Sequence, residues 1–127
     1  MKKIVALIVM ATCLMLLIMA CGNKQLNIKE VSSIVIMNEE DNTSMEIKDA
    51  EIVEKITKEF NSFSLKKGKE IEIPPGWTYQ LIWRDVNDKI VQVLGVVDEG
   101  TIGYNDHYYS ISSGDIDMDF FAGLFNS

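Results

Sequence analysis

The polar and apolar positions in the first half of the chain change from an alternating to a helical spacing. Val31 to Met37 is rich in β-branched residues and bounded by charge, which predicts a strand. Thr43 to Lys48 predicts a second strand, and the turn-rich residues 38–42 between them favour a hairpin. Residues 49–63 then have apolar side chains three and four positions apart, which predicts a helix with Asp49 as its N-cap. The apolar face of this helix comprises Ile52, Val53, Ile56, Phe60 and Phe63.

Turn signals follow one another closely in the second half of the chain. Residues 65–73 are basic and then acidic, which predicts a connector that ends at Pro74-Pro75-Gly76. Short apolar segments then alternate with turns rich in Asn, Asp and Gly, which is typical of an antiparallel meander of four strands. We expect these strands at 77–86, 89–97, 101–104 and 107–111. A short C-terminal helix follows, capped by Ser113 or Asp115, with apolar positions Ile116, Phe120, Phe121 and Leu124.

This order of elements predicts an α+β domain. Its antiparallel sheet would consist of the N-terminal hairpin and the four-strand meander, with the main helix packed on one face and a short helix at the end. Residues 30–127 are expected to fold alone as a monomer, without a metal or a disulfide. In that core, the apolar face of the main helix would meet Tyr79, Leu81 and Trp83 of the meander.

The most strongly apolar segment is the N-terminus. Ile4 to Ala20 is a run of 17 residues that follows Lys2-Lys3 and ends in a small residue, which is the arrangement of a secretory signal. This length also reaches the lower limit for a membrane-spanning helix, so a permanent transmembrane anchor is the alternative. The polar residues 22–25 and the lack of a basic cluster after the run favour the signal.

Residues Ile18-Met19-Ala20-Cys21 resemble, in order and type, the lipobox of bacterial lipoproteins. The resemblance implies that Cys21 receives a diacylglycerol on its sulfur and becomes the new N-terminus. Residues 1–20 would then be the signal peptide and residues 21–29 a lipidated spacer. The protein would be anchored on the extracytoplasmic face of the cell membrane. The whole pattern resembles the small lipoproteins of low-GC Gram-positive bacteria, a likeness that brings no functional residues with it.

The net charge of the chain after residue 20 limits the classes of binding partner that we expect. Without Lys2 and Lys3, ten basic residues face nineteen acidic ones, a formal net charge of −9. Nucleic-acid binding is disfavoured because phosphate contacts need clustered Lys and Arg, and adsorption to anionic lipid headgroups is disfavoured likewise. We therefore expect the membrane as a partner through the lipid anchor alone. Cys21 is the sole cysteine after residue 20, which leaves no thiol for a disulfide or a metal site.

A candidate calcium loop begins at three alternating carboxylates. Asp115, Asp117 and Asp119 have the spacing of its first ligands, but the sixth and twelfth positions hold Phe120 and Asn126 where such a loop needs Gly and Glu. Acidic residues are also favoured in the first turn of a helix. We therefore predict that these three carboxylates mark the start of a helix and do not bind a metal.

The single histidine is the other candidate for chemistry. A catalytic base needs a nucleophile and an orienting group, whereas the neighbours of His107 are ordinary turn and strand residues. We predict that His107 is a surface residue. The sequence therefore predicts no catalytic residue and no cofactor.

Aromatic side chains remain as candidates for a binding surface. Trp77, Tyr79, Leu81 and Trp83 alternate, which predicts that they share one face of a strand. We expect this face to pack under the main helix. The alternative is an exposed patch, with Trp77 presented by the preceding loop, that stacks a ligand or receives a protein. The candidate binding residues are Trp77, Tyr104, Tyr108 and Tyr109.

These features predict a membrane-anchored surface lipoprotein whose domain is a non-catalytic binding module for a protein or a small ligand. An inhibitor or immunity-type protein is a special case. The alternative is a small extracytoplasmic hydrolase or cell-wall-modifying enzyme. An enzyme needs a polar cluster in a concave site, whereas the polar residues here are concentrated in turns and the strands are apolar.

Overall fold

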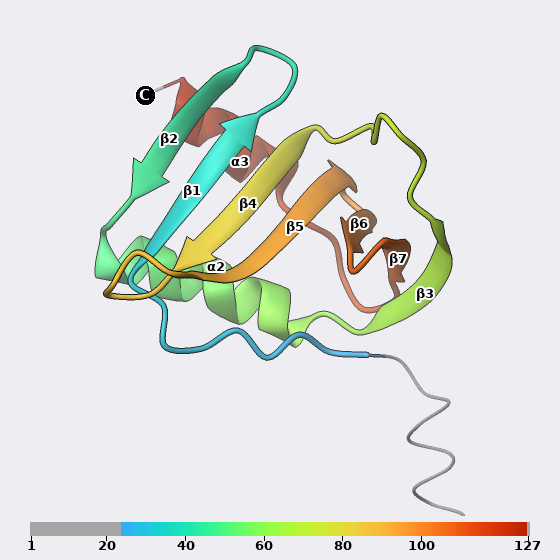
Figure 1. Cartoon of the computed structure of the whole chain (residues 1–127), viewed down its shortest axis with the longest axis horizontal. Coiled ribbons are helices and arrows are strands. Elements are labelled where there is room, and N and C mark those ends of the chain that lie inside the picture. Colours follow the sequence, from blue (N-terminus) through green and yellow to red (C-terminus); the bar gives the residue numbers. More distant parts are fainter. Residues whose placement is uncertain (1–23, 127) are drawn as a thin grey trace, which may run out of the picture.

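The computed structural model describes residues 24–126, which contain seven strands and two helices (Figure 1). The strands are β1 (Ser33–Asn38), β2 (Thr43–Ile47), β3 (Leu65–Glu70), β4 (Tyr79–Arg84), β5 (Ile90–Asp98), β6 (Thr101–Tyr104) and β7 (His107–Ile111). The helices are α2 (Ala50–Ser62) and α3 (Met118–Phe125). The predicted signal peptide and Cys21 lie outside the described residues. Neither helix in 24–126 is long and apolar enough to cross a membrane.

All seven strands form one antiparallel sheet in the order β2-β1-β4-β5-β6-β7-β3. The predicted α+β class is confirmed, and the hairpin and the meander occupy the first six places. The sheet is larger than predicted because Leu65–Glu70, predicted as a connector, is β3 and pairs with β7. Only Leu65 of this strand is buried. An edge strand can be this polar because backbone bonds, rather than side-chain burial, join it to the sheet.

Helix α2 is joined to the sheet by one polar and one aromatic contact in the core. Asp49 caps the helix as predicted, since its Oδ1 accepts hydrogen bonds from two first-turn N–H groups at 3.0 and 3.3 Å. Trp83 Nε1 of β4 donates to Thr57 Oγ1 at 3.0 Å, and its ring lies 5.5 Å from that of Phe60, edge to face. The predicted packing of this helix on the meander is therefore confirmed. The largest fully buried side chains are Trp83, Phe60, Phe121, Ile34, Ile36, Ile56, Leu65, Leu81, Leu94, Ile102 and Val96.

The N-cap of helix α3 lies two residues after Asp115, the second of its two predicted caps. Asp117 is the N-cap, and its Oδ1 accepts from a first-turn N–H at 3.1 Å. The predicted cap at Ser113 or Asp115 is wrong because the preceding backbone is bonded to the β5–β6 turn: Ile116 N donates to Glu99 O at 2.8 Å. The helix can start only after that bond.

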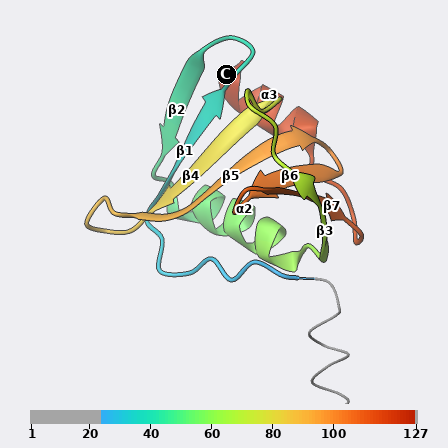
Figure 2. The ribbon, with the colours of Figure 1, turned by 45° about the vertical axis from the view of Figure 1, so that its right-hand side comes forward.

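Both helices cover the same face of the sheet (Figures 1 and 2). Tyr79 of β4 packs against α3, where its ring is stacked on Phe125 at 6.0 Å and lies 5.5 Å from Phe121. Leu81 and Trp83 follow on the same face and are fully buried. Neither of the two helices in residues 24–126 covers the opposite face of β4 and β5.

The segment before β1 runs beneath α2 and packs on the domain (Figure 1). Lys24 forms an antiparallel bridge with Leu65 through two backbone hydrogen bonds of 2.8 and 2.7 Å. Leu26 and Ile28 are buried, and the Asn61 side chain of α2 holds both the N–H and the C=O of Ile28 at 2.8 Å. Of the predicted spacer, the residues from Lys24 onward therefore belong to the packed structure.

Candidate binding surface

Trp77 lies on the sheet face opposite the helices, over two paired glycines. Gly95 of β5 and Gly103 of β6 face each other in the sheet. A Cβ added at Gly95 would stand 2.6 Å from Trp77 Cε2, and one added at Gly103 would stand 2.6 Å from Trp77 Cζ3. The indole therefore occupies the volume that two side chains would otherwise fill. The prediction that Trp77 shares a face with Tyr79 and Trp83 is wrong, because regular alternation starts only where β4 starts.

The four predicted binding aromatics are divided between the two faces. Trp77 and Tyr108 are together, with ring centroids 5.8 Å apart in an edge-to-face arrangement. Tyr104 and Tyr109 are buried, and their rings stack on each other at 4.6 Å. Tyr108 and Tyr109 are consecutive in β7, so they point to opposite faces. Trp77 and Tyr108 can share a surface, whereas Tyr104 and Tyr109 belong to the core.

The first half of β5 has a free edge beside this aromatic pair. Strand β6 pairs with β5 only from Gly95 to Asp98, so within the described chain Ile90–Leu94 has β4 on one side and no strand on the other. The exposed side chains of this half are apolar: Ile90, Val91 and Val93 are 61, 41 and 37 % exposed. An unpaired row of backbone groups lined with apolar side chains is a template for another extended chain.

A shallow pocket of about 560 Å³ lies between this free edge and the β6–β7 turn. Trp77 and the backbone of Gly95 and Gly103 line it on one side, and Asn105-Asp106 lines it on the other. Both turn residues have positive φ, at 49° and 66°, which matches the twist of a two-residue hairpin. Aromatic, backbone and turn carboxylate groups thus meet beside an unpaired strand.

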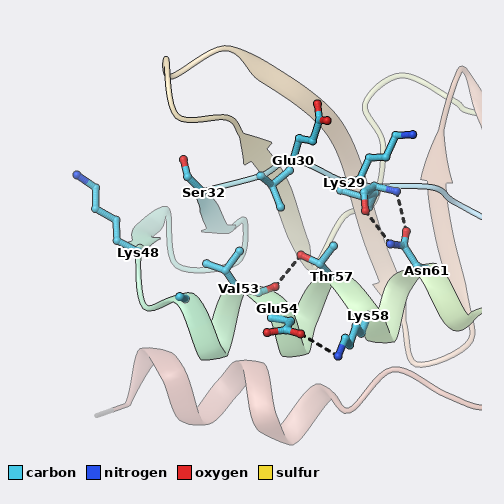
Figure 3. Close-up of a pocket in the computed structure, with 12 residues that line it drawn as sticks. Lys29, Glu30, Ser32, Lys48, Val53, Glu54, Thr57, Lys58 and Asn61 are labelled. Carbon is cyan, nitrogen blue, oxygen red and sulfur yellow. Dashed lines mark hydrogen bonds and ion pairs between the residues drawn. The ribbon is translucent and has the colours of Figure 1, made fainter.

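A second pocket, of about 650 Å³, lies between the segment before β1 and α2 (Figure 3). Several of its polar side chains are already paired within the protein. Thr57 Oγ1 donates to Val53 O at 2.6 Å, and Lys58 pairs with Glu54 at 2.8 Å. The Lys58 ammonium lowers the pKa of Glu54 by hydrogen bonding and by its charge. We interpret this pocket as the margin of the docked N-terminal segment.

The residues that the sequence offered for chemistry have local roles. His107 Nδ1 lies 3.3 Å from the carbonyl oxygen of Asn105, in the turn that precedes it. The Asp117 carboxylate caps α3. Within residues 24–126 no group of three or more His, Cys, Asp or Glu side chains is placed to hold a metal ion.

The free edge and the glycine pair were not predicted, although both leave a signal in the sequence. Glycine in the interior of a strand marks close approach of another group, and Gly95 and Gly103 both stand inside predicted strands. The predicted strands 89–97 and 101–104 also differ in length, so one cannot cover the other along its whole edge.

No family model, no curated protein and no solved structure matches this chain.

Proposed function

We propose that the protein is a lipoprotein anchored through Cys21 on the outer face of the cell membrane, and that its domain is a non-catalytic module that binds an extended polypeptide segment. The observation that carries the binding role is the free half of β5, Ile90–Leu94, beside Trp77. An incoming strand would complete the hydrogen bonds of this edge, which is the mode of β-augmentation.

The surface offers both affinity and selection. Each backbone hydrogen bond formed contributes about 0.5–1.5 kcal/mol net, whatever the sequence of the partner. Selection would come from side chains, which alternate between the two faces of an added strand. On the face without helices, such side chains would meet Val93 and the Trp77–Tyr108 pair. We expect a partner with apolar or aromatic residues at every second position.

The anchoring part of the proposal is supported by the sequence pattern that ends at Cys21. Two acyl chains on one cysteine hold a protein stably at a membrane, because each buried methylene contributes about 0.8 kcal/mol. The non-catalytic part is supported by the composition of the surface, where aliphatic side chains, an indole, amides and backbone are joined by a single carboxylate, that of Asp106.

Site-specific photocrosslinking in intact cells tests the binding role. A photoreactive amino acid at Val91 samples the free edge, and the same residue at Ser44 in β2 samples the opposite edge of the sheet as a control. We expect an adduct from Val91 that is lost with Trp77→Ala or Val93→Lys, and none from Ser44. Equal adducts at both positions, or none at Val91, would contradict the binding role. An adduct of twice the chain mass would identify a second copy as the occupant.

A further inference from the structure

Four lysines gather at one edge of this acidic domain. Three of them lie on the exposed length of β3, and the fourth is joined to the same strand by the Lys24–Leu65 bridge. The lysine edge, as we call it, consists of Lys24, Lys66, Lys67 and Lys69. It holds four of the ten basic residues that follow Cys21, in a chain with nineteen acidic ones.

The positive charge of the lysine edge is not neutralised by its neighbours. The strand paired with β3 is β7, His107–Ile111, which contains no carboxylate. The two ion pairs among the described residues use Lys48 and Lys58, which lie elsewhere. Glu70 ends β3 at its far end, away from Lys24. The Lys24 ammonium also lies 5.1 Å from the centre of the Tyr104 ring, and the Tyr104 phenol raises the pKa of Lys24.

The covalent chain places this edge close to Cys21. Cys21 precedes Lys24 by three residues, and a fully extended chain spans at most about 3.6 Å per residue, so the two Cα atoms lie within about 11 Å. Strand β3 extends from Leu65 to Lys69 over about 13 Å. The lysine edge therefore starts about one Debye length from the anchored cysteine and ends no more than about three away, so a domain that lies with β3 along the membrane brings all four ammonium groups to the headgroups.

We propose that the lysine edge binds the anionic phospholipid headgroups around the anchor and so holds the domain in one orientation on the membrane. This inference rests on the proposed lipidation of Cys21. Two acyl chains already retain the protein, so the lysines select an orientation rather than a location. The acidic remainder of the domain is repelled by the same surface, which favours the same orientation. The net charge disfavours lipid adsorption, but the distribution of charge permits it at this one edge.

Lysine acylation on the lipidated full chain tests the inference. The protein is reconstituted in vesicles of phosphatidylcholine with or without phosphatidylglycerol, and a membrane-impermeant amine reagent is followed at each lysine by mass spectrometry. We expect severalfold lower labelling of Lys24, Lys66, Lys67 and Lys69 in the anionic vesicles only. Labelling of Lys48, Lys58 and Lys89, which lie off this edge, should be the same in both vesicles.

A matched pair of variants separates the edge from overall charge. The triple variant K66Q/K67Q/K69Q should lose the protection of Lys24, since each lysine contributes about fivefold to residence at an anionic surface. The control variant K48Q/K58Q/K89Q removes the same amount of charge and should retain the protection of Lys24. Uniform labelling of a membrane-bound, lipidated protein would overturn the orientation and leave the anchor intact. A chain with no lipid on Cys21 that stays out of the membrane fraction would overturn both.

Discussion

The indole of Trp77 lies against Gly95, in the space that any larger residue at position 95 would need. This contact holds a tryptophan on the open face of the sheet while leaving part of it accessible. Gly103 of the neighbouring strand β6 likewise leaves room for the indole, so the two glycines together form the seat of Trp77. A half-buried aromatic side chain that is already packed beside a free strand edge suits a binding surface, because a preorganised side chain loses little conformational entropy when a partner binds.

Gly95→Ala should displace Trp77 and lower the free energy of unfolding by about 1–3 kcal/mol, the usual cost of overpacking. Gly76→Ala is the control: its Cβ would meet nothing within 4 Å, so we expect a change within about 0.5 kcal/mol. Denaturant titrations and tryptophan fluorescence provide the two measurements. In a Trp77→Ala background the Gly95→Ala cost should largely disappear, because the clash has been removed. An undiminished cost there would show that the seat is not occupied by Trp77.

Phe60→Ala should cost about 3–5 kcal/mol, because its ring is fully buried between Trp83, Phe63 and Phe121. His107→Ala should change stability by no more than about 0.5 kcal/mol, since the exposed hydrogen bond of its imidazole is to Asn105 in the preceding turn. The same titrations measure both. A small loss of unfolding free energy in Phe60→Ala together with a large loss in His107→Ala would mean that the buried and exposed residues have been assigned wrongly.

Asn61→Ala should release the segment before β1. The substitution removes two hydrogen bonds to the backbone of Ile28, at about 0.5–1.5 kcal/mol each. The part-buried N–H and C=O groups of Ile28 then lose these hydrogen-bond partners. Hydrogen exchange at the Ile28 amide should accelerate, while Asn87→Ala in the exposed β4–β5 turn should leave it unchanged. Unaltered exchange at Ile28 in Asn61→Ala would show that Leu26 and Ile28 alone hold the segment.

Glu59 should make stability fall as pH rises from acidic to neutral. Desolvation raises the pKa of Glu59, and the charge of Asp117 adds to this, whereas the Asp117 backbone and the Lys55 ammonium oppose it. The folded state therefore holds the proton of Glu59 to a higher pH than the unfolded chain does, and stability falls as the pH rises from the unfolded pKa to the raised folded pKa. Glu59→Gln should stabilise the domain at neutral pH and have little effect below about pH 4.

Glu54→Gln is the matched control with the opposite sign. The Lys58 ammonium lowers the pKa of Glu54, so its ionisation favours the folded state. This variant should slightly lower stability at neutral pH. Denaturant titrations at both pH values compare the two. A Glu59→Gln variant less stable than the wild type at neutral pH would contradict the desolvation of Glu59.

The elements that the sequence predicted correctly depend on interactions between residues close to each other along the chain. Asp49 caps α2 through N–H groups two and three residues away, and the stripe from Val53 to Phe60 repeats with the helical period. The hairpin and the meander also follow from turns between adjacent segments. Such features need no knowledge of the tertiary structure.

What the sequence could not predict depends on contacts between distant residues. Strand β3 exists because Leu65 pairs with Ile111, 46 positions later, and nothing in its polar composition announces that partner. Trp77 leaves the face of Tyr79 because Gly95 and Gly103 create a seat on the other side. The lysine edge likewise appears only when β3 and Lys24 are joined.

The lipidation of Cys21 is tested most directly by the mass of the N-terminal peptide of the protein purified from membranes. We expect a peptide that begins at Cys21 and carries a diacylglycerol, whereas Cys21→Ala should accumulate as an unlabelled precursor that retains residues 1–20. A wild-type protein that keeps residues 1–20 on an unmodified cysteine, or a Cys21→Ala variant that is still cleaved and lipid-labelled, would contradict it.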